Sequence, residues 1–227
     1  MTPRVTLIHA VAVAIEPIAS AFATLWPEAR CTNVLEDSLS GDRAAEGELS
    51  DRMSLRINAL ADYAVLAGAE GILFTCSAFG PAIEQAARRL PVPVLKPNEA
   101  MFVEALAAGR RIGMLATFGP AVATMEAEFR EAAAAAGVDA RIETILVEGA
   151  VEALRAGDTE AHNRLVAQQA AELADCDAVM LAHFSTSRAR AAVEEALGRT
   201  VLTSPAAAVT ALSDRINRGR DRARSHC

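Results

Sequence analysis

Short runs of apolar residues alternate along the chain with longer, alanine-rich stretches in which apolar positions recur at helical spacing. Runs this short, bounded by Gly, Pro and polar residues, are typical of buried strands. They cover Val5–His9, Thr32–Leu35, Gly71–Thr75, Val92–Leu95, Arg111–Ala116, Arg141–Leu146, Ala178–Ala182 and Thr200–Leu202. The helical pattern covers Ala14–Leu25, Leu49–Ala67, Pro81–Arg89, Asn98–Ala107, Pro120–Ala136, Thr159–Ala174, Ser187–Leu197 and Pro205–Arg215. This alternation predicts an α/β protein with parallel strands joined by right-handed crossovers.

The elements repeat at an offset of 107 residues, the separation of Cys76 and His183. The order of elements and the hydrophobic pattern hold along this offset with no gap. They predict two similar lobes, residues 1–97 with 204–227 and residues 98–203, each a four-stranded parallel sheet flanked by helices. A pseudo-two-fold axis would relate the lobes and place the active site between them. The alternative is a coincidence of regular α/β spacing.

Composition narrows the class of partner. The formal net charge is −7 and the pI is near 5.2, which argues against nucleic acid as the main partner. The basic cluster over residues 215–224 is interpreted as a solvated helix end and frayed tail. No apolar run is long enough to span a membrane and no signal peptide is evident, so we expect a soluble, cytoplasmic protein. A homodimer is the default assembly.

The four cysteines, Cys31, Cys76, Cys176 and Cys227, form no C-x-x-C pair. Structural zinc and a disulfide framework are therefore not expected. Cys31, Cys176 and Cys227 are interpreted as a core residue, a helix end and a tail residue. Phosphate-loop, dinucleotide-binding and nucleophile-elbow motifs are absent, and the histidines lack partners at metal spacing. The sequence therefore predicts neither a cofactor nor a metal.

Small polar residues follow the third predicted strand in the segment Thr75-Cys76-Ser77, with Pro81 opening the next helix. Backbone N–H groups of this turn and the hydroxyls of Thr75 and Ser77 would bind a carboxylate. The same helix terminus would favour the thiolate of Cys76. The alternative is a small cysteine buried at a strand end.

The second half offers His183, Ser185 and Thr186 at the equivalent place. His183 could act as a general acid or base near neutral pH, or be a satisfied structural histidine. His9 ends the first predicted strand of the first half, and Thr117 follows the first predicted strand of the second half. Both should line the same cleft. Ligands bind beyond the carboxyl ends of strands in open parallel sheets, so the repeat predicts that Cys76 and His183 approach one ligand from opposite sides.

The chain resembles the aspartate/glutamate/hydantoin racemase superfamily, which includes maleate isomerase and arylmalonate decarboxylase. The resemblance covers nearly the whole chain and rests on the repeat and on three segments, Phe74–Ser77, Arg111–Thr117 and Val201–Pro205. It implies two cysteines on opposite faces of the substrate, one removing and one supplying a proton. Cys76 matches the first cysteine by position, whereas His183 stands in place of the second.

The resemblance favours a cofactor-independent racemase or isomerase that transfers protons α to a carboxylate or carbonyl of an amino acid, hydantoin or related acid. Cys76 and His183 would be catalytic, and His9, Thr75, Ser77, Thr117, Ser185 and Thr186 would bind the substrate. One alternative is a decarboxylase or other lyase that protonates an enolate on one face. Another is a non-catalytic binding or regulatory homologue that kept the cleft.

Overall fold

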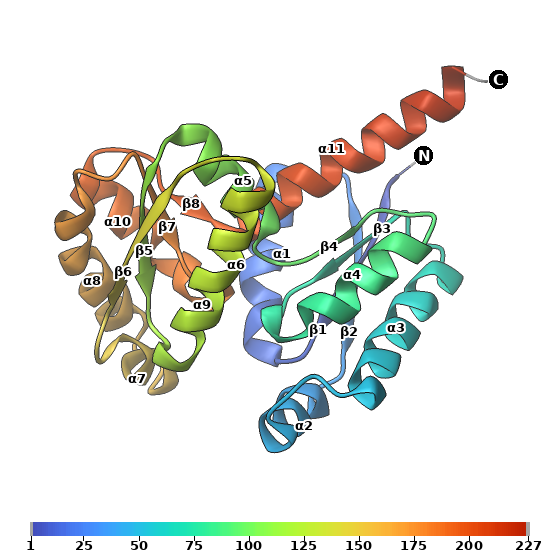
Figure 1. Ribbon diagram of the computed structural model, residues 1–227, viewed down its shortest axis with the longest axis horizontal. Coiled ribbons are helices and arrows are strands. Elements are labelled where there is room, and N and C mark those ends of the chain that lie inside the picture. The colour runs from blue at the N-terminus through green and yellow to red at the C-terminus, as the bar shows by residue number, and fades with distance from the viewer. Residues whose placement is uncertain (1, 226–227) are drawn as a thin grey trace. The chain divides into compact units, whose positions relative to one another are not determined.

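The computed structural model describes residues 2–225 and contains two four-stranded parallel sheets flanked by helices (Figure 1). The chain divides into two compact units. Unit 1 contains the chain up to Asn98 and again from Ala208, and unit 2 contains Glu99–Ala207. The two sheets predicted from the sequence are confirmed.

In unit 1 the strand order is β2-β1-β3-β4. The strands are β1 (Arg4–His9), β2 (Arg30–Leu35), β3 (Gly71–Phe74) and β4 (Val94–Leu95). The helical segments are η1 (Ala12–Ala14), α1 (Ile15–Leu25), α2 (Ser38–Glu46), α3 (Asp51–Leu66), η2 (Ser77–Phe79), α4 (Gly80–Arg89) and most of α11 (Ser204–Ser225). All residues of β3 are buried, as expected for a central strand covered on both faces.

Helices cover both faces of the unit 1 sheet. Ile57 on α3 and Ile83 on α4 join a buried cluster with Ile72 of β3. On α11, Leu212 and Ile216 are buried, and a Cβ added at Gly71 would lie 2.9 and 2.7 Å from their Cδ1 atoms. Glycine at the start of β3 therefore lets α11 approach the strand closely.

In unit 2 the order is β6-β5-β7-β8. The strands are β5 (Arg111–Ala116), β6 (Arg141–Leu146), β7 (Ala178–Leu181) and β8 (Leu202–Thr203). The helical segments are α5 (Glu99–Ala108), η3 (Gly119–Ala121), α6 (Val122–Ala135), α7 (Ala150–Arg155), α8 (Thr159–Ala170), η4 (Ala171–Leu173), α9 (His183–Thr186), η5 (Ser187–Ala189) and α10 (Arg190–Leu197). Helix α8 packs against α7 and α10, and α5 packs against α6 through Phe102 and Phe129, whose rings meet edge to face at 5.7 Å.

The strand register repeats between the units. Val5 pairs with Gly71, and the residues 107 positions later, Ile112 and Ala178, also pair. The second strands break this offset, because Val5 pairs with Cys31 but Ile112 pairs with Ile142, 111 positions after Cys31. The expectation of a repeat with no gap is therefore wrong at β6. The crossover helix α6 has 14 residues against 11 in α1, which accounts for most of the shift.

Four helical features differ from the sequence prediction. Helices α2, α7 and α9 were not predicted, since α2 is short and polar, α7 has only six residues and α9 only four. Helix α11 continues to Ser225, so the basic cluster interpreted as a solvated helix end and frayed tail is helical throughout. Arg220 explains part of this extension, because its guanidinium donates to both carboxylate oxygens of Glu70 at 2.6–2.9 Å. Cys227 lies outside the described residues.

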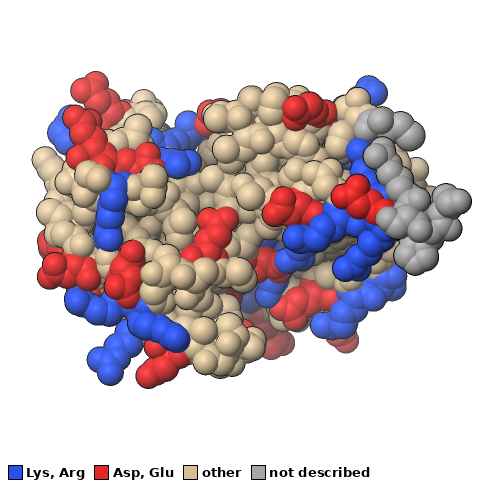
Figure 2. Space-filling model, turned by 90° about the horizontal axis from the view of Figure 1, so that it is seen from above, with Lys and Arg blue, Asp and Glu red and all other residues tan. Residues whose placement is uncertain are grey.

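Acidic and basic side chains are interspersed on the face that Figure 2 presents, and neither sign dominates it. Among the described helices, none is both long and apolar enough to cross a membrane.

Candidate functional site

Each sheet has a topological switch point. From β1 the chain adds β2 on one side and later β3 on the other, and β5 lies likewise between β6 and β7. In open parallel sheets, ligands bind beyond the carboxyl ends of the strands at such points. The residues selected from the sequence lie at these ends, namely His9, Thr75, Cys76 and Ser77 in unit 1 and Thr117, His183, Ser185 and Thr186 in unit 2.

Cys76 is the second residue after β3 and precedes η2 with extended backbone angles (φ −127°, ψ 126°). Cys76 and Ser77 are half-buried, whereas the flanking Thr75 and Phe79 are buried. The buried strand fixes the backbone up to Phe74, and η2 and α4 fix it from Ser77 onward. The thiol therefore lies between two ordered elements at the edge of the sheet.

His9 and Thr75 are joined across the unit 1 switch point. His9 is fully buried, and its Nδ1 lies 2.9 Å from Thr75 Oγ1. Its Nε2 lies 2.9 Å from Asn33 Oδ1 on β2. Burial lowers the pKa of His9, and the hydrogen bond to Asn33 only partly opposes this shift. His9 is therefore a neutral imidazole near pH 7 whose two nitrogens are engaged within unit 1.

His183 differs from His9 both in its backbone conformation and in its hydrogen bonding. It begins α9 with a φ of +65°, and it is the one described non-glycine residue with a positive φ. Both ring nitrogens are shielded from solvent, yet neither makes a hydrogen bond of normal geometry to a described residue. Strained residues with buried, unsatisfied polar atoms cost stability and cluster at functional sites.

Burial also lowers the pKa of His183, with the Ala182 backbone partly opposing the shift. The imidazole is therefore neutral near pH 7 and can accept a proton. An imidazolium at this position, which would favour a thiolate at Cys76, is not supported.

Hydroxyl groups meet at the unit 2 switch point. Thr117 follows β5 and Thr186 closes α9, and their Oγ1 atoms lie 3.2 Å apart. Both residues are buried, and the half-buried Ser185 precedes Thr186. A side-chain hydrogen bond thus links the segments that follow the two central strands in each unit, His9 to Thr75 in unit 1 and Thr117 to Thr186 in unit 2. The sequence could not show these bonds, because they link residues 66 and 69 positions apart.

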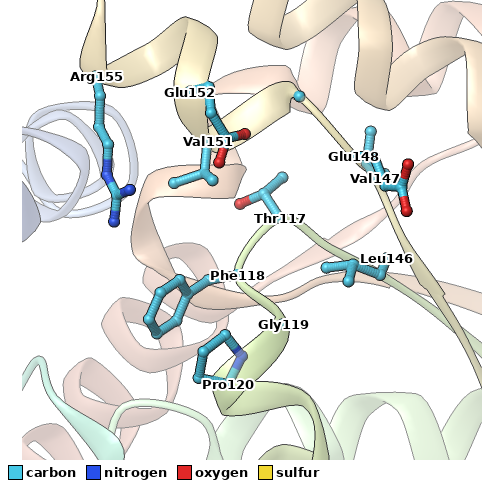
Figure 3. A pocket seen from close by; sticks show the side chains of 11 residues that line it. Thr117, Phe118, Gly119, Pro120, Leu146, Val147, Glu148, Val151, Glu152 and Arg155 are labelled. Atoms are coloured by element: carbon cyan, nitrogen blue, oxygen red, sulfur yellow. The ribbon is translucent and has the colours of Figure 1, made fainter.

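A pocket of about 360 Å³ opens beside Thr117 in unit 2 (Figure 3). Its walls are the loop after β5 and the segment from the end of β6 through α7. Apolar groups of Phe118, Pro120, Leu146 and Val151 line it together with Glu148, Glu152 and Arg155. None of these three charged groups forms an ion pair with another described residue. Glu152 and Arg155 were not selected from the sequence, because they lie on α7, which was not predicted.

The other described thiols are less suited to chemistry. Cys31 lies half-buried on the edge strand β2, so its interpretation as a core residue is wrong, and burial raises its pKa to about 11. Cys176 is buried between η4 and β7, and burial raises its pKa as well. Over residues 2–225, no group of three or more His, Cys, Asp or Glu side chains is arranged to hold a metal ion.

These features define an α/β protein with polar and titratable residues at the carboxyl edges of two parallel sheets. The sequence profile described as Asp/Glu/Hydantoin racemase matches residues 13–212. The chain belongs to this family. A comparison with curated proteins finds no match.

Solved structures share the fold at low sequence identity. Allantoin racemase from Pseudomonas fluorescens superposes with a TM-score of 0.70 at 18% identity, covering 95% of this chain and 92% of that one. Aspartate racemase from Picrophilus torridus gives 0.69 at 14% identity, with coverages of 95% and 94%. A Gly74Cys mutant of arylmalonate decarboxylase gives 0.67 at 17% identity, again with 95% and 94%.

Proposed function

We propose that this protein is a cofactor-independent racemase or isomerase that transfers protons at the carbon α to a carboxylate or carbonyl of a small molecule. The substrate class is an amino acid, a hydantoin or a related acid. Cys76 and His183 are the two proton-transfer groups, acting on opposite faces of one carbon. The observation that carries the proposal is His183 itself, a half-buried residue at positive φ whose ring nitrogens are shielded from solvent and make no hydrogen bond of normal geometry to a described residue, at the position equivalent to Cys76.

The proton balance follows from a neutral His183. In one direction, the imidazole takes the α-proton, the C–H electron pair moves into the adjacent carbonyl, and the Cys76 thiol returns a proton to the opposite face. His183 is then an imidazolium and Cys76 a thiolate. In the reverse direction, the thiolate takes the α-proton and the imidazolium returns one to the opposite face. Each group must lie within about 3–3.5 Å of the atom it acts on in the substrate complex.

The hydroxyls at the strand ends supply binding. Ser77, Ser185, Thr117 and Thr186 are proposed to hold the carboxylate and the negative charge that develops on the carbonyl oxygen. His9 and Thr75 complete the unit 1 side. The pocket beside Thr117 would take the substituent of the substrate that lies away from the reacting carbon.

The deciding experiment screens single enantiomers of amino acids, hydantoins and substituted malonates for turnover in D₂O. A racemase places deuterium in the recovered substrate, whereas a decarboxylase places it only in the product. Cys76→Ser and His183→Asn should each lower turnover at least about a hundredfold, and Cys31→Ser should not. Turnover that survives both site substitutions, or ligand binding without any exchange, would refute the proposal.

A further inference from the structure

Three side chains form a hydrogen-bonded row across the carboxyl end of the unit 1 sheet. Asn33 on β2, His9 at the end of β1 and Thr75 after β3 are linked by two contacts of 2.9 Å each. His9 in the middle is fully buried and Thr75 is nearly so, whereas Asn33 is exposed at the edge strand. The row ends one residue before Cys76.

Counting donors and acceptors fixes the direction of these bonds. The oxygen of Asn33 faces His9 Nε2, and an amide oxygen only accepts, so Nε2 carries the proton. A neutral imidazole then has a bare Nδ1, which must accept the proton of the Thr75 hydroxyl. The other acceptor near this hydroxyl, the carbonyl of Ile8, is more distant at 3.4 Å.

The hydrogen bond to His9 determines what Thr75 can offer a ligand. A hydroxyl has a single proton, and here that proton is used internally, so Thr75 presents only oxygen lone pairs. Lone pairs repel a carboxylate and attract an N–H group. A fixed acceptor also discriminates strongly, because a ligand that lacks the donor leaves a buried polar group unmatched.

We infer that His9 is a positioning residue, held in one tautomer by Asn33, that makes Thr75 a hydrogen-bond acceptor for an N–H group of the substrate rather than a donor to its carboxylate. The inference rests on the proposed function in placing the substrate beside Cys76. An acceptor at Thr75 restricts the substrates to those with an ammonium, amide or imide N–H near the reacting carbon. The substrate carboxylate is then bound by the other hydroxyls of the site.

The tautomer can be measured without a substrate. Long-range ¹H–¹⁵N NMR of the imidazoles, with the His9 signals assigned through His9→Gln, should show a protonated Nε2 and a bare Nδ1. Asn33→Leu, at an exposed position, should lose this preference, whereas Thr32→Leu on the same edge strand should keep it. A protonated Nδ1 in the unaltered protein would overturn the inference.

Ligand preference is tested by protection of Cys76 from iodoacetamide. Propionamide and propionate have nearly the same shape, but only the amide offers N–H groups. Thr75→Val should weaken protection by propionamide roughly three- to tenfold, as expected for one hydrogen bond, and leave protection by propionate unchanged. Thr75→Ser should restore it.

Protection of the unaltered protein by propionate alone, or by neither compound, would overturn the inference. These measurements need no turnover. A protein that passes them but racemises nothing would refute the proposed function while the assignment of Thr75 stands.

Discussion

Cys76 and His183 occupy equivalent places in the two sheets, since each is the second residue after the third strand of its unit. They differ in their surroundings. Cys76 is half-buried in extended backbone, whereas His183 is held at a φ of +65° with its ring nitrogens shielded from solvent. The strand topology therefore places a thiol in one unit and an imidazole in the other at equivalent positions.

Cys76 should be the most readily alkylated of the described cysteines near neutral pH. Burial keeps the thiol of Cys31 protonated, with a pKa of about 11, and Cys176 is buried. In a Cys227→Ser background, which removes the C-terminal thiol, mass-spectrometric mapping should show Cys76 reacting about tenfold faster than either, or more. Faster labelling of Cys31 would contradict the assignment of Cys76.

Replacing His183 should separate stability from activity. Asn tolerates a positive φ better than His, so His183→Asn should relieve strain while removing the base. Turnover should fall about 10²- to 10⁴-fold, the usual loss for a general base, while the urea midpoint stays level or rises. A clear loss of stability with activity retained would make His183 a structural residue.

The two proton-transfer groups are proposed to serve one carbon, which requires them to come close. In a His183→Cys variant, dibromobimane should link Cys76 to the introduced thiol and give the fluorescent bridged product. Asn163→Cys, on α8 and away from the ends of the unit 2 strands in sequence, provides the control for adventitious bridging. Two separately labelled thiols in the His183→Cys variant would show that the groups do not share a ligand.

Acidification should begin to destabilise the fold near neutral pH. Burial lowers the pKa of His9 and of His183 below 6.5, so the unfolded chain binds more protons as the pH falls through that value. Stability should therefore decrease from about pH 7 towards pH 5. Carboxylates such as Glu36 and Glu70, whose pKa values are lowered from 4.5, act in a more acidic range.

Urea unfolding at a series of pH values measures this slope. His183→Asn should reduce it, because that histidine then contributes nothing to the difference in protons bound. A midpoint independent of pH between about 7 and 5 would show that neither imidazole is kept neutral by the fold.

Close packing of unit 2 should make Gly113 intolerant of a side chain. A Cβ at this position in β5 would lie 2.9–3.2 Å from atoms of Leu173 and Cys176, and one of them is the Cβ of Leu173, which cannot swing away. Gly113→Ala should cost about 1–3 kcal/mol of stability, the usual range for overpacking. Gly219→Ala on α11, with nothing within 4 Å, is the control and should be neutral or slightly stabilising.

Much of this architecture can be predicted from short stretches of sequence. Strand β3 and strand β7 are short, fully buried apolar runs, and such runs are recognisable wherever they occur. Their ends fall next to Cys76 and His183, so both candidate residues could be selected without a structure. Helix α2 escaped prediction for the converse reason. Its sequence is polar, and its ion pairs come from α3, where Arg52 contacts Glu46 and Arg56 contacts Asp42.

The sequence by itself determined the two-sheet α/β fold and the residues that follow each central strand, because hydrophobic periodicity and turn residues act over a few positions. Only the tertiary structure decided the state of those residues. The partners of His9, the Thr117–Thr186 bond and the Arg220–Glu70 contact join residues 24 to 150 positions apart. The isolation of His183 likewise depends on which side chains the completed fold leaves out of reach, and no local pattern records it.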